Sequence, residues 1–142
     1  MDCGIRIADC KAIYPKSAFE KDVVMNKEEL KRRTKLFALD VIRLVESLPR
    51  GRTIDILCRQ LLRSGTSVGA NYRAACRAKS PADFISKMGI VEEEADESLY
   101  WIELLVEAGF LGVNKAQPLS TEAGELLAIT VASLKTAKRN KS

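Results

Sequence analysis

Histidine is missing from this sequence of 142 residues. Imidazole is the usual general acid or base near neutral pH, and it completes Ser-His and Cys-His nucleophilic pairs, mixed Cys/His zinc sites and Glu-x-x-His di-iron sites. Its absence excludes all of these chemistries. Only carboxylate, lysine or tyrosine chemistry remains for an enzyme, so we predict a protein that is not an enzyme and has no cofactor.

Long apolar runs are also missing. No stretch approaches the roughly 20 apolar residues needed to cross a bilayer. The first residues, Met1 to Arg6, lack the basic-then-apolar order of a secretory signal. We therefore predict a cytoplasmic protein that does not contact a membrane.

Cysteine is scarce, with 4 residues. Cys58 and Cys76 fall in one predicted helix, about 27 Å apart at the helical rise per residue, which is too far for a disulfide or a shared ion. Cys3 and Cys10 lack the Cys-x-x-Cys spacing of a metal site. The sequence therefore predicts reduced thiols and no metal site.

Alternating β patterns are absent as well, and from residue 26 apolar residues recur at three- and four-residue steps. The boundary signals are capping residues and one proline: Asn26, Thr53, Ser80, Gly109, Pro118, and Ser120 or Thr121. The predicted helices span about 27–48, 54–78, 81–108 and 121–138. A flexible or irregular arm over 1–25 precedes them, and a basic tail over 139–142 follows. Short connections predict one all-α domain over 26–138, an antiparallel up-down-up-down four-helix bundle.

Charge is unevenly distributed along the chain, although the net charge is only +4. Residues 26–79 contain 13 basic and 5 acidic side chains, for a net charge of +8. Residues 80–112 contain 1 basic and 8 acidic side chains, for a net charge of −7. Such asymmetry indicates a charged partner or self-assembly.

Four arginines of the predicted helix 54–78 share one edge, opposite its apolar face: Arg59, Arg63, Arg73 and Arg77. At about 100° per residue they fall within about 40° of one line. Arginines in such a row bind phosphates through bidentate hydrogen bonds. The alternative is a solvated helix face whose arginines pair with carboxylates.

The predicted helix 81–108 carries carboxylates along one side: Glu92, Asp96, Glu103 and Glu107. Without histidine or further oxygen donors, these do not make a specific metal cage. We expect this acidic edge to face an arginine edge, either within the bundle or between subunits.

The same helix has apolar residues on a second face, away from its core positions: Ile90, Tyr100, Trp101 and Leu104. Apolar residues on two faces indicate burial against something beyond the bundle, and Trp and Tyr are enriched at interface centres. We predict a homo-oligomer whose interface contains this patch together with Glu92, Asp96 and Glu103. The alternative is that Trp101 only flanks the core.

Gly65 and Gly69 lie four residues apart on the packing side of the predicted helix 54–78. Each costs about 1 kcal/mol relative to alanine in a helix, so we predict that a neighbouring helix approaches closely there. A polar seam runs beside them: Gln60, Ser64, Ser67 and Asn71. These side chains either form hydrogen bonds between helices or contact a nucleic acid.

The segment LLRSGTSVGANYRA at 61–74 resembles the signature helix of the bacterial four-helix-bundle protein family. This family is also called the rRNA intervening-sequence proteins, and it includes the accessory variability determinant of diversity-generating retroelements. The segments RAKSPADF at 77–84 and EEADESLYW at 93–101 are similar to the family's third helix. The resemblance covers about residues 30–135.

The resemblance implies a bundle that assembles as a homopentamer and has no known catalytic activity. Some relatives are encoded within insertions in rRNA genes, and the retroelement relatives bind nucleic acid and a reverse transcriptase through basic surfaces. A reverse transcriptase partner rests on this analogy alone. From the sequence we predict a homo-oligomer that binds RNA or DNA through the arginine edge, without sequence specificity. The alternative is a scaffold or accessory subunit whose arginine and carboxylate edges pair between subunits.

Overall fold

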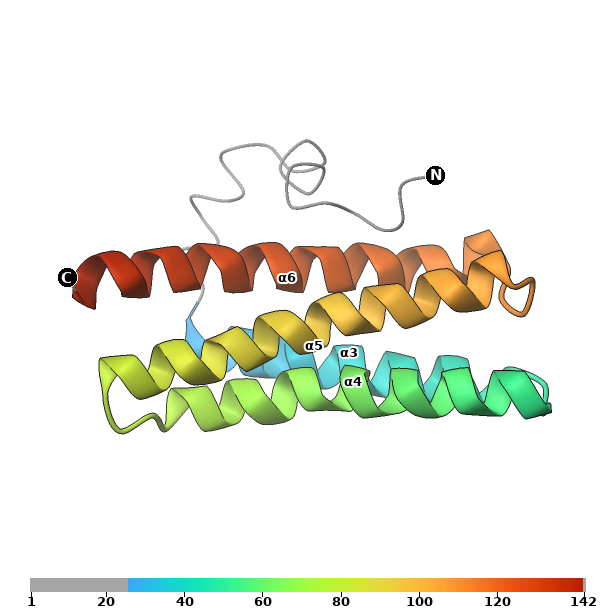
Figure 1. The fold of residues 1–142 in the computed structure, drawn as a ribbon, viewed down its shortest axis with the longest axis horizontal. Helices are drawn as coiled ribbons and strands as arrows, with labels where there is room; N and C mark the ends of the chain where they lie inside the picture. The colour runs from blue at the N-terminus through green and yellow to red at the C-terminus, as the bar shows by residue number, and fades with distance from the viewer. Residues whose placement is uncertain (1–25, 142) are drawn as a thin grey trace.

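Four long helices make up the part of the chain that the computed structural model describes, residues 26–141 (Figure 1). Helix α3 spans Lys27–Glu46, α4 spans Arg52–Cys76, α5 spans Pro81–Glu107 and α6 spans Val113–Lys141. Successive helices run antiparallel, and no strand occurs between residues 26 and 141. The predicted all-α four-helix bundle is confirmed.

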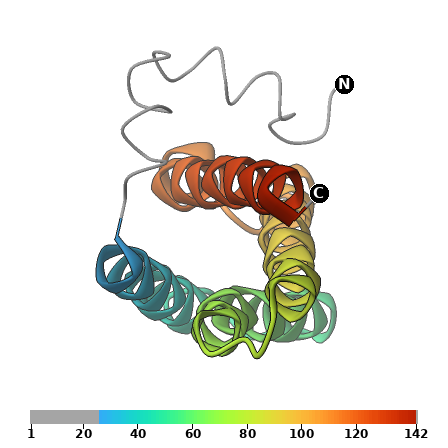
Figure 2. The ribbon, with the colours of Figure 1, turned by 90° about the vertical axis from the view of Figure 1, so that its left-hand side faces the viewer.

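The helices occupy the four corners of the bundle. Viewed end-on, α3 lies opposite α5, while α4 lies opposite α6 (Figure 2). Each helix packs on the helix that follows it in the chain, and α3 also contacts α6. The outer faces of α3 and α5 therefore point in opposite directions.

Side-chain caps fix the starts of α3 and α5. The Asn26 side chain accepts a hydrogen bond from the Glu29 amide at 2.8 Å, and the Ser80 hydroxyl accepts one from the Asp83 amide at 3.1 Å. The Asp83 carboxylate in turn accepts from the Lys79 amide at 3.0 Å. Both caps satisfy amides that the first helical turn leaves without an internal partner.

Helix α4 begins at Arg52, slightly earlier than predicted, so Thr53 lies inside the helix and is not its N-cap. Gly51 takes the cap position, and its amide donates to the Asp55 carboxylate at 3.3 Å. Arg50 also binds Asp55, and this hydrogen bond holds the pKa of the carboxyl below its ordinary value.

Gly109 ends α5 in the left-handed conformation, with φ at 83°. Its amide donates to the Val106 carbonyl at 3.0 Å, and the Phe110 amide donates to the Leu105 carbonyl at 2.9 Å. These two hydrogen bonds make a Schellman motif, which turns the chain sharply toward α6.

Helix α6 differs most from its prediction, because it begins at Val113 and not near residue 121. Pro118 therefore lies inside the helix. The Gly112 carbonyl accepts from the Ala116 amide at 3.0 Å, which starts the helix before the proline. Ala116 and Leu119 are buried, so packing offsets the backbone hydrogen bond that proline cannot make.

The C-terminal prediction also changes, because α6 continues to Lys141 and residues 139–141 are helical rather than a separate tail. The predicted arm over 1–25, with Cys3 and Cys10, lies outside the described residues.

The core is a single apolar cluster to which every helix contributes. Its largest fully buried apolar side chains are Phe37 and Val41 of α3, Leu61 and Val68 of α4, Met88, Val91, Ile102 and Leu105 of α5, and Leu126 of α6. Each such side chain contributes about 1.5–3 kcal/mol through burial. The outer faces of the helices therefore lie outside this core.

An ion cluster joins the first and last of these helices. Arg33 of α3 donates to the carboxylates of Glu122 and Glu125 on α6, the latter at 2.8 Å. Only 18% of the Arg33 side chain is exposed. Burial raises the pKa of Glu122 above its ordinary value, although Arg33 opposes the rise.

Candidate nucleic-acid interface

The predicted arginine edge lies on the outer face of α4. Arg59, Arg63, Arg73 and Arg77 are all exposed, opposite the buried side of the helix. Arg52 is also exposed and follows the same line at helical spacing. The sequence prediction missed Arg52 because it started the helix at residue 54. We refer to these five residues as the arginine row.

The arginine row is long enough to follow a nucleic-acid backbone. From Arg52 to Arg77 it extends about 37 Å along the helix axis. One turn of duplex DNA measures roughly 34–36 Å. A single straight helix can therefore place cations along one full turn of a duplex.

Arg63 is partly neutralised within the chain. Its guanidinium donates to Glu97 at 2.6 Å and to Glu94 at 3.5 Å, and it also contacts Gln60. Burial raises the pKa of Glu94, and Arg63 opposes that rise. The predicted acidic edge consists of Glu92, Asp96, Glu103 and Glu107, so it does not include the two carboxylates that contact α4. Glu94 and Glu97 lie three residues apart on the side of α5 that also carries Trp101. This spacing was the signal in the sequence that could have identified them.

The other members of the arginine row are less engaged. The charge of Arg59 helps to lower the pKa of Asp55, whereas Arg50 forms the ion pair with that carboxylate. Among the described residues, no carboxylate lies within ion-pair distance of Arg52, Arg73 or Arg77. As far as residues 26–141 are concerned, these three guanidinium groups are available to an anion.

Close packing fixes α4 against α3 behind the arginine row. A Cβ atom added at Gly65 would lie 2.9 Å from Val41 Cγ2, and one at Gly69 would lie 3.2 Å from Thr34 Oγ1. Both distances are shorter than ordinary van der Waals contacts. The two glycines therefore let α3 and α4 approach more closely than alanine would allow.

The polar seam of α4 is used mainly for hydrogen bonds within the protein. The buried Ser98 hydroxyl of α5 donates to Ser64 Oγ at 3.1 Å, which joins the two helices. Ser67 donates to the Arg63 carbonyl, and Asn71 donates to the Ser67 carbonyl. Gln60 accepts from Arg63. These contacts occupy the side chains without requiring a nucleic acid.

The second apolar face of α5 is partly exposed. Ile90 is 39% exposed and Tyr100 is 50% exposed, whereas Trp101 packs against the flank of the core. The rings of Tyr100 and Trp101 meet edge to face with centroids 5.1 Å apart. Leu104 is half-buried. Tyr100 and Ile90 are therefore the exposed apolar residues of the predicted interface.

The carboxylates predicted on the acidic edge stay near the surface of α5. Asp96 and Glu107 are exposed, while Glu92 and Glu103 are half-buried. Partial burial raises the pKa of Glu103, and the neighbouring charges of Glu107 and Asp96 raise it further. No group of three metal-ligating side chains gathers in the described part of the chain.

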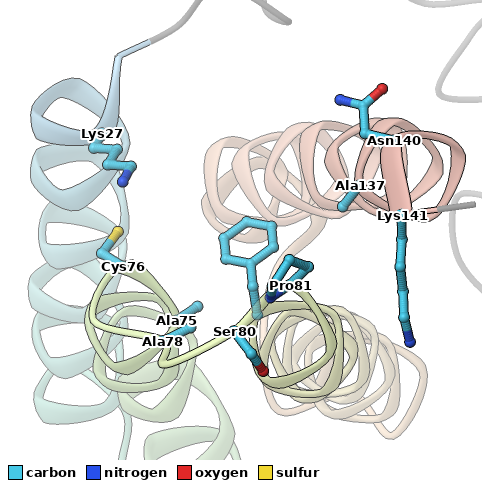
Figure 3. Close-up of a pocket in the computed structure, with 10 residues that line it drawn as sticks. Lys27, Ala75, Cys76, Ala78, Ser80, Pro81, Ala137, Asn140 and Lys141 are labelled. Carbon is cyan, nitrogen blue, oxygen red and sulfur yellow. The ribbon is translucent and has the colours of Figure 1, made fainter.

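A cavity of about 280 Å³ opens at the end of the bundle where α4 meets α5 (Figure 3). Lys27 and Lys141 line it together with Ser80, Pro81 and Cys76. Cys76 also forms a hydrogen bond with Tyr72, whose pKa is raised by burial and by this contact. The cavity lies at the end of α4, beside Arg77 in sequence and apart from the rest of the arginine row.

No helix within residues 26–141 combines the length and apolar character needed to cross a membrane. The fold and its outer faces define an all-α bundle that presents an arginine row on one helix and an acidic, partly apolar face on the next.

The family follows from comparison with known proteins. The model of the 23S rRNA-intervening sequence protein family matches residues 26–132, and the chain belongs to this family. The crystal structure of a protein of unknown function from the S23 ribosomal protein family of Bacteroides thetaiotaomicron is similar, with 32% identity and a TM-score of 0.73. The match covers 78% of this chain and 99% of that one. No curated protein matches the chain.

Proposed function

We propose that this protein is a non-enzymatic, self-assembling bundle that binds RNA or DNA through the arginine row of α4. One observation carries the proposal: five exposed arginines share one helix face, and Arg52, Arg73 and Arg77 have no carboxylate partner among the described residues. The description of the family, which refers to 23S rRNA, favours RNA as the natural ligand.

Binding of this kind recognises the phosphate backbone of a nucleic acid and does not distinguish its bases. Guanidinium groups pair with phosphates bidentately and release counterions, which gives affinity without sequence information. The polar seam that would have offered base contacts is already hydrogen-bonded inside the protein. We therefore expect similar affinities for ligands of similar shape and different sequence.

Self-assembly would strengthen a weak contact. Copies of the bundle in one particle present several arginine rows to the same ligand, so that the later contacts form intramolecularly. The proposed site of action is the cytoplasm, where the free thiols of Cys58 and Cys76 remain reduced.

A salt series tests the proposal. Binding of the full chain to structured RNA and to duplex DNA is measured by fluorescence anisotropy at increasing salt. Three contacts per copy give a slope of log affinity against log salt of about −2.7 on duplex DNA. Replacing Arg52, Arg73 and Arg77 together with Ala should remove most of this slope, and Arg63→Ala should have a smaller effect because its charge is already paired.

The matched control is Lys138→Ala on α6, which removes one exposed cation without changing α4. Its affinity and its slope should stay close to those of the unmodified protein. Salt-independent binding, or a triple variant that binds as tightly as the unmodified protein, would refute the proposal.

A second candidate function is a scaffold in which the arginine row pairs with α5 carboxylates of another subunit. The contact of Arg63 with Glu94 and Glu97 favours it, because one arginine of the row already pairs with α5 carboxylates within the chain. In that case the triple variant dissociates into monomers, and the unmodified protein does not bind nucleic acid at any salt concentration. Light scattering on the same samples distinguishes the two functions.

A further inference from the structure

The cavity at the end of the bundle, which we call the end cavity, has apolar walls (Figure 3). Short or flat side chains form these walls: Ala75, Ala78, Pro81, Phe84 and Ala137. Phe84 packs against the core but is only half-buried. Of the described residues that line the end cavity, none is an aspartate or a glutamate. The walls therefore suit a ligand with an apolar, uncharged body.

Two lysines from different helices lie at the opening of the end cavity. Lys27 extends from the first turn of α3 toward Cys76, and Lys141 lies on the opposite side, at the end of α6 (Figure 3). Neither lysine forms an ion pair with a residue between 26 and 141. The Ser80 hydroxyl also lines the cavity and donates no hydrogen bond to that part of the chain. The opening therefore offers hydrogen-bond donors and positive charge to an anion.

The volume of the end cavity limits the size of this ligand. Pockets that bind drug-sized molecules measure about 300–1,000 Å³. The end cavity, at about 280 Å³, lies just below that range. A flat ring with one attached anionic group matches both the apolar walls and the basic opening. A nucleotide has these two parts, because its base stacks on aromatic side chains and its phosphate pairs with cations.

The position of the end cavity favours a nucleotide over other small organic anions. Ala75 and Cys76, which line it, are the last residues of α4, and Arg77 of the arginine row follows them directly. Lys79, in the connection to α5, is a further exposed cation without an ion-pair partner between residues 26 and 141. A strand whose phosphates follow the arginine row to Arg77 therefore brings its terminal nucleotide to this end of the bundle.

We propose that the end cavity binds one nucleotide, with the base against Phe84 and the apolar walls and the phosphate between Lys27 and Lys141. The choice of a nucleotide rests on the proposed function, because the arginine row leads a nucleic acid toward this end of the bundle. The same chemistry is available from two sources, a free mononucleotide and the phosphorylated end of an RNA strand. Base stacking accepts any base, so the end cavity should bind without sequence specificity.

Cys76 provides a local measurement of binding, because its thiol lines the end cavity whereas Cys58 is buried elsewhere in α4. The full chain is alkylated with iodoacetamide, and mass spectrometry follows the Cys76 peptide separately. The probes are adenosine monophosphate, a short RNA that begins with 5′-phosphorylated adenosine, and inorganic phosphate. A nucleotide at ten times its dissociation constant should slow alkylation of Cys76 about tenfold. Inorganic phosphate at the same concentration should not, because it lacks the base.

Substitutions at the end cavity test which residues hold the nucleotide. Lys27→Gln combined with Lys141→Gln should weaken nucleotide binding about tenfold or more, because two charged hydrogen-bond donors are lost. Lys115→Gln is the matched control, since Lys115 is an exposed lysine at the opposite end of α6, and it should bind like the unmodified protein. Ala137→Leu fills part of the cavity and should also weaken binding. Each variant is compared with its own alkylation rate without ligand, and circular dichroism establishes that it is folded.

Protection of Cys76 by the mononucleotide supports a free ligand, and protection by the RNA alone supports a strand end. Three results would overturn the nucleotide site: no protection by either probe, equal protection by inorganic phosphate, or full protection in the double lysine variant. Nucleotide protection in a protein without salt-dependent RNA binding refutes only the proposed function. RNA binding with the expected salt slope, but with Cys76 unprotected, refutes only the nucleotide site.

Discussion

Single residues set the distance between α3 and α4. The nearest atom to a Cβ built at Gly65 belongs to Val41, a branched side chain that is itself fully buried. A short branched side chain has little room to move in a close-packed core. The glycine is therefore a packing requirement, even though glycine is a poor helix former.

Gly65→Ala should lower the free energy of unfolding by about 1–3 kcal/mol, because overpacking outweighs the gain in helix propensity. Chemical denaturation measures the change. Gly89→Ala on α5 is the control, since a Cβ there would meet no atom within 4 Å. It should stabilise the protein by up to about 1 kcal/mol through helix propensity alone. Equal effects of the two substitutions would contradict this packing argument.

The spacing of the two glycines was sufficient to predict a close helix approach from the sequence, but not which helix approaches. Residue periodicity identifies the buried side of α4, whereas the partner depends on how the helices are arranged around the core. The structure supplies Val41 and Thr34 as the neighbouring residues.

Helix boundaries were predictable where a side chain forms the cap. Ser80 and Asn26 accept hydrogen bonds at the starts expected for them. The start of α6 was not predictable in this way, because a backbone carbonyl of Gly112 begins the helix and Pro118 misleadingly resembles a boundary. A proline early in a helix loses only one internal hydrogen bond, and buried neighbours offset the loss.

The cluster around Arg33 holds α6 against α3. Arg33→Ala should lower the free energy of unfolding by about 2–4 kcal/mol, because two partly buried carboxylates lose their cation. Thermal and chemical denaturation measure the effect. Adding Glu122→Gln and Glu125→Gln to Arg33→Ala should recover part of the loss. If the triple variant is no more stable than Arg33→Ala alone, the carboxylates are not the source of the effect.

At the scale of the whole molecule, the segment charges of +8 and −7 indicated an interaction surface but not its geometry. The arginine row was predictable because one helix carries it. The contact of Arg63 with Glu94 and Glu97 was not, since it depends on the packing of α4 on α5. The exposed apolar residues Leu36, Leu39 and Ile42 of α3 were missed, although their helical positions opposite the core residues of α3 were the available signal.

The molecule has no histidine, the side chain whose ordinary pKa lies closest to neutral pH. The carboxylates with raised pKa, Glu94, Glu103 and Glu122, start from an ordinary value of 4.5. Nucleic-acid affinity at fixed salt should therefore stay within about twofold between pH 6.5 and pH 8. Anisotropy titrations across this range test the expectation. A several-fold fall would reveal a titrating group in the interface.

The separation of the core from the arginine row has a consequence for how such bundles diverge. The row lies on the face of α4 that the core does not use, and most of its members form no ion pair with another residue between 26 and 141. Substitutions there change the ligand-binding surface with little effect on the free energy of unfolding. The ligand can therefore change during evolution while the fold is kept. A shared fold at 32% identity therefore allows two members to bind different ligands.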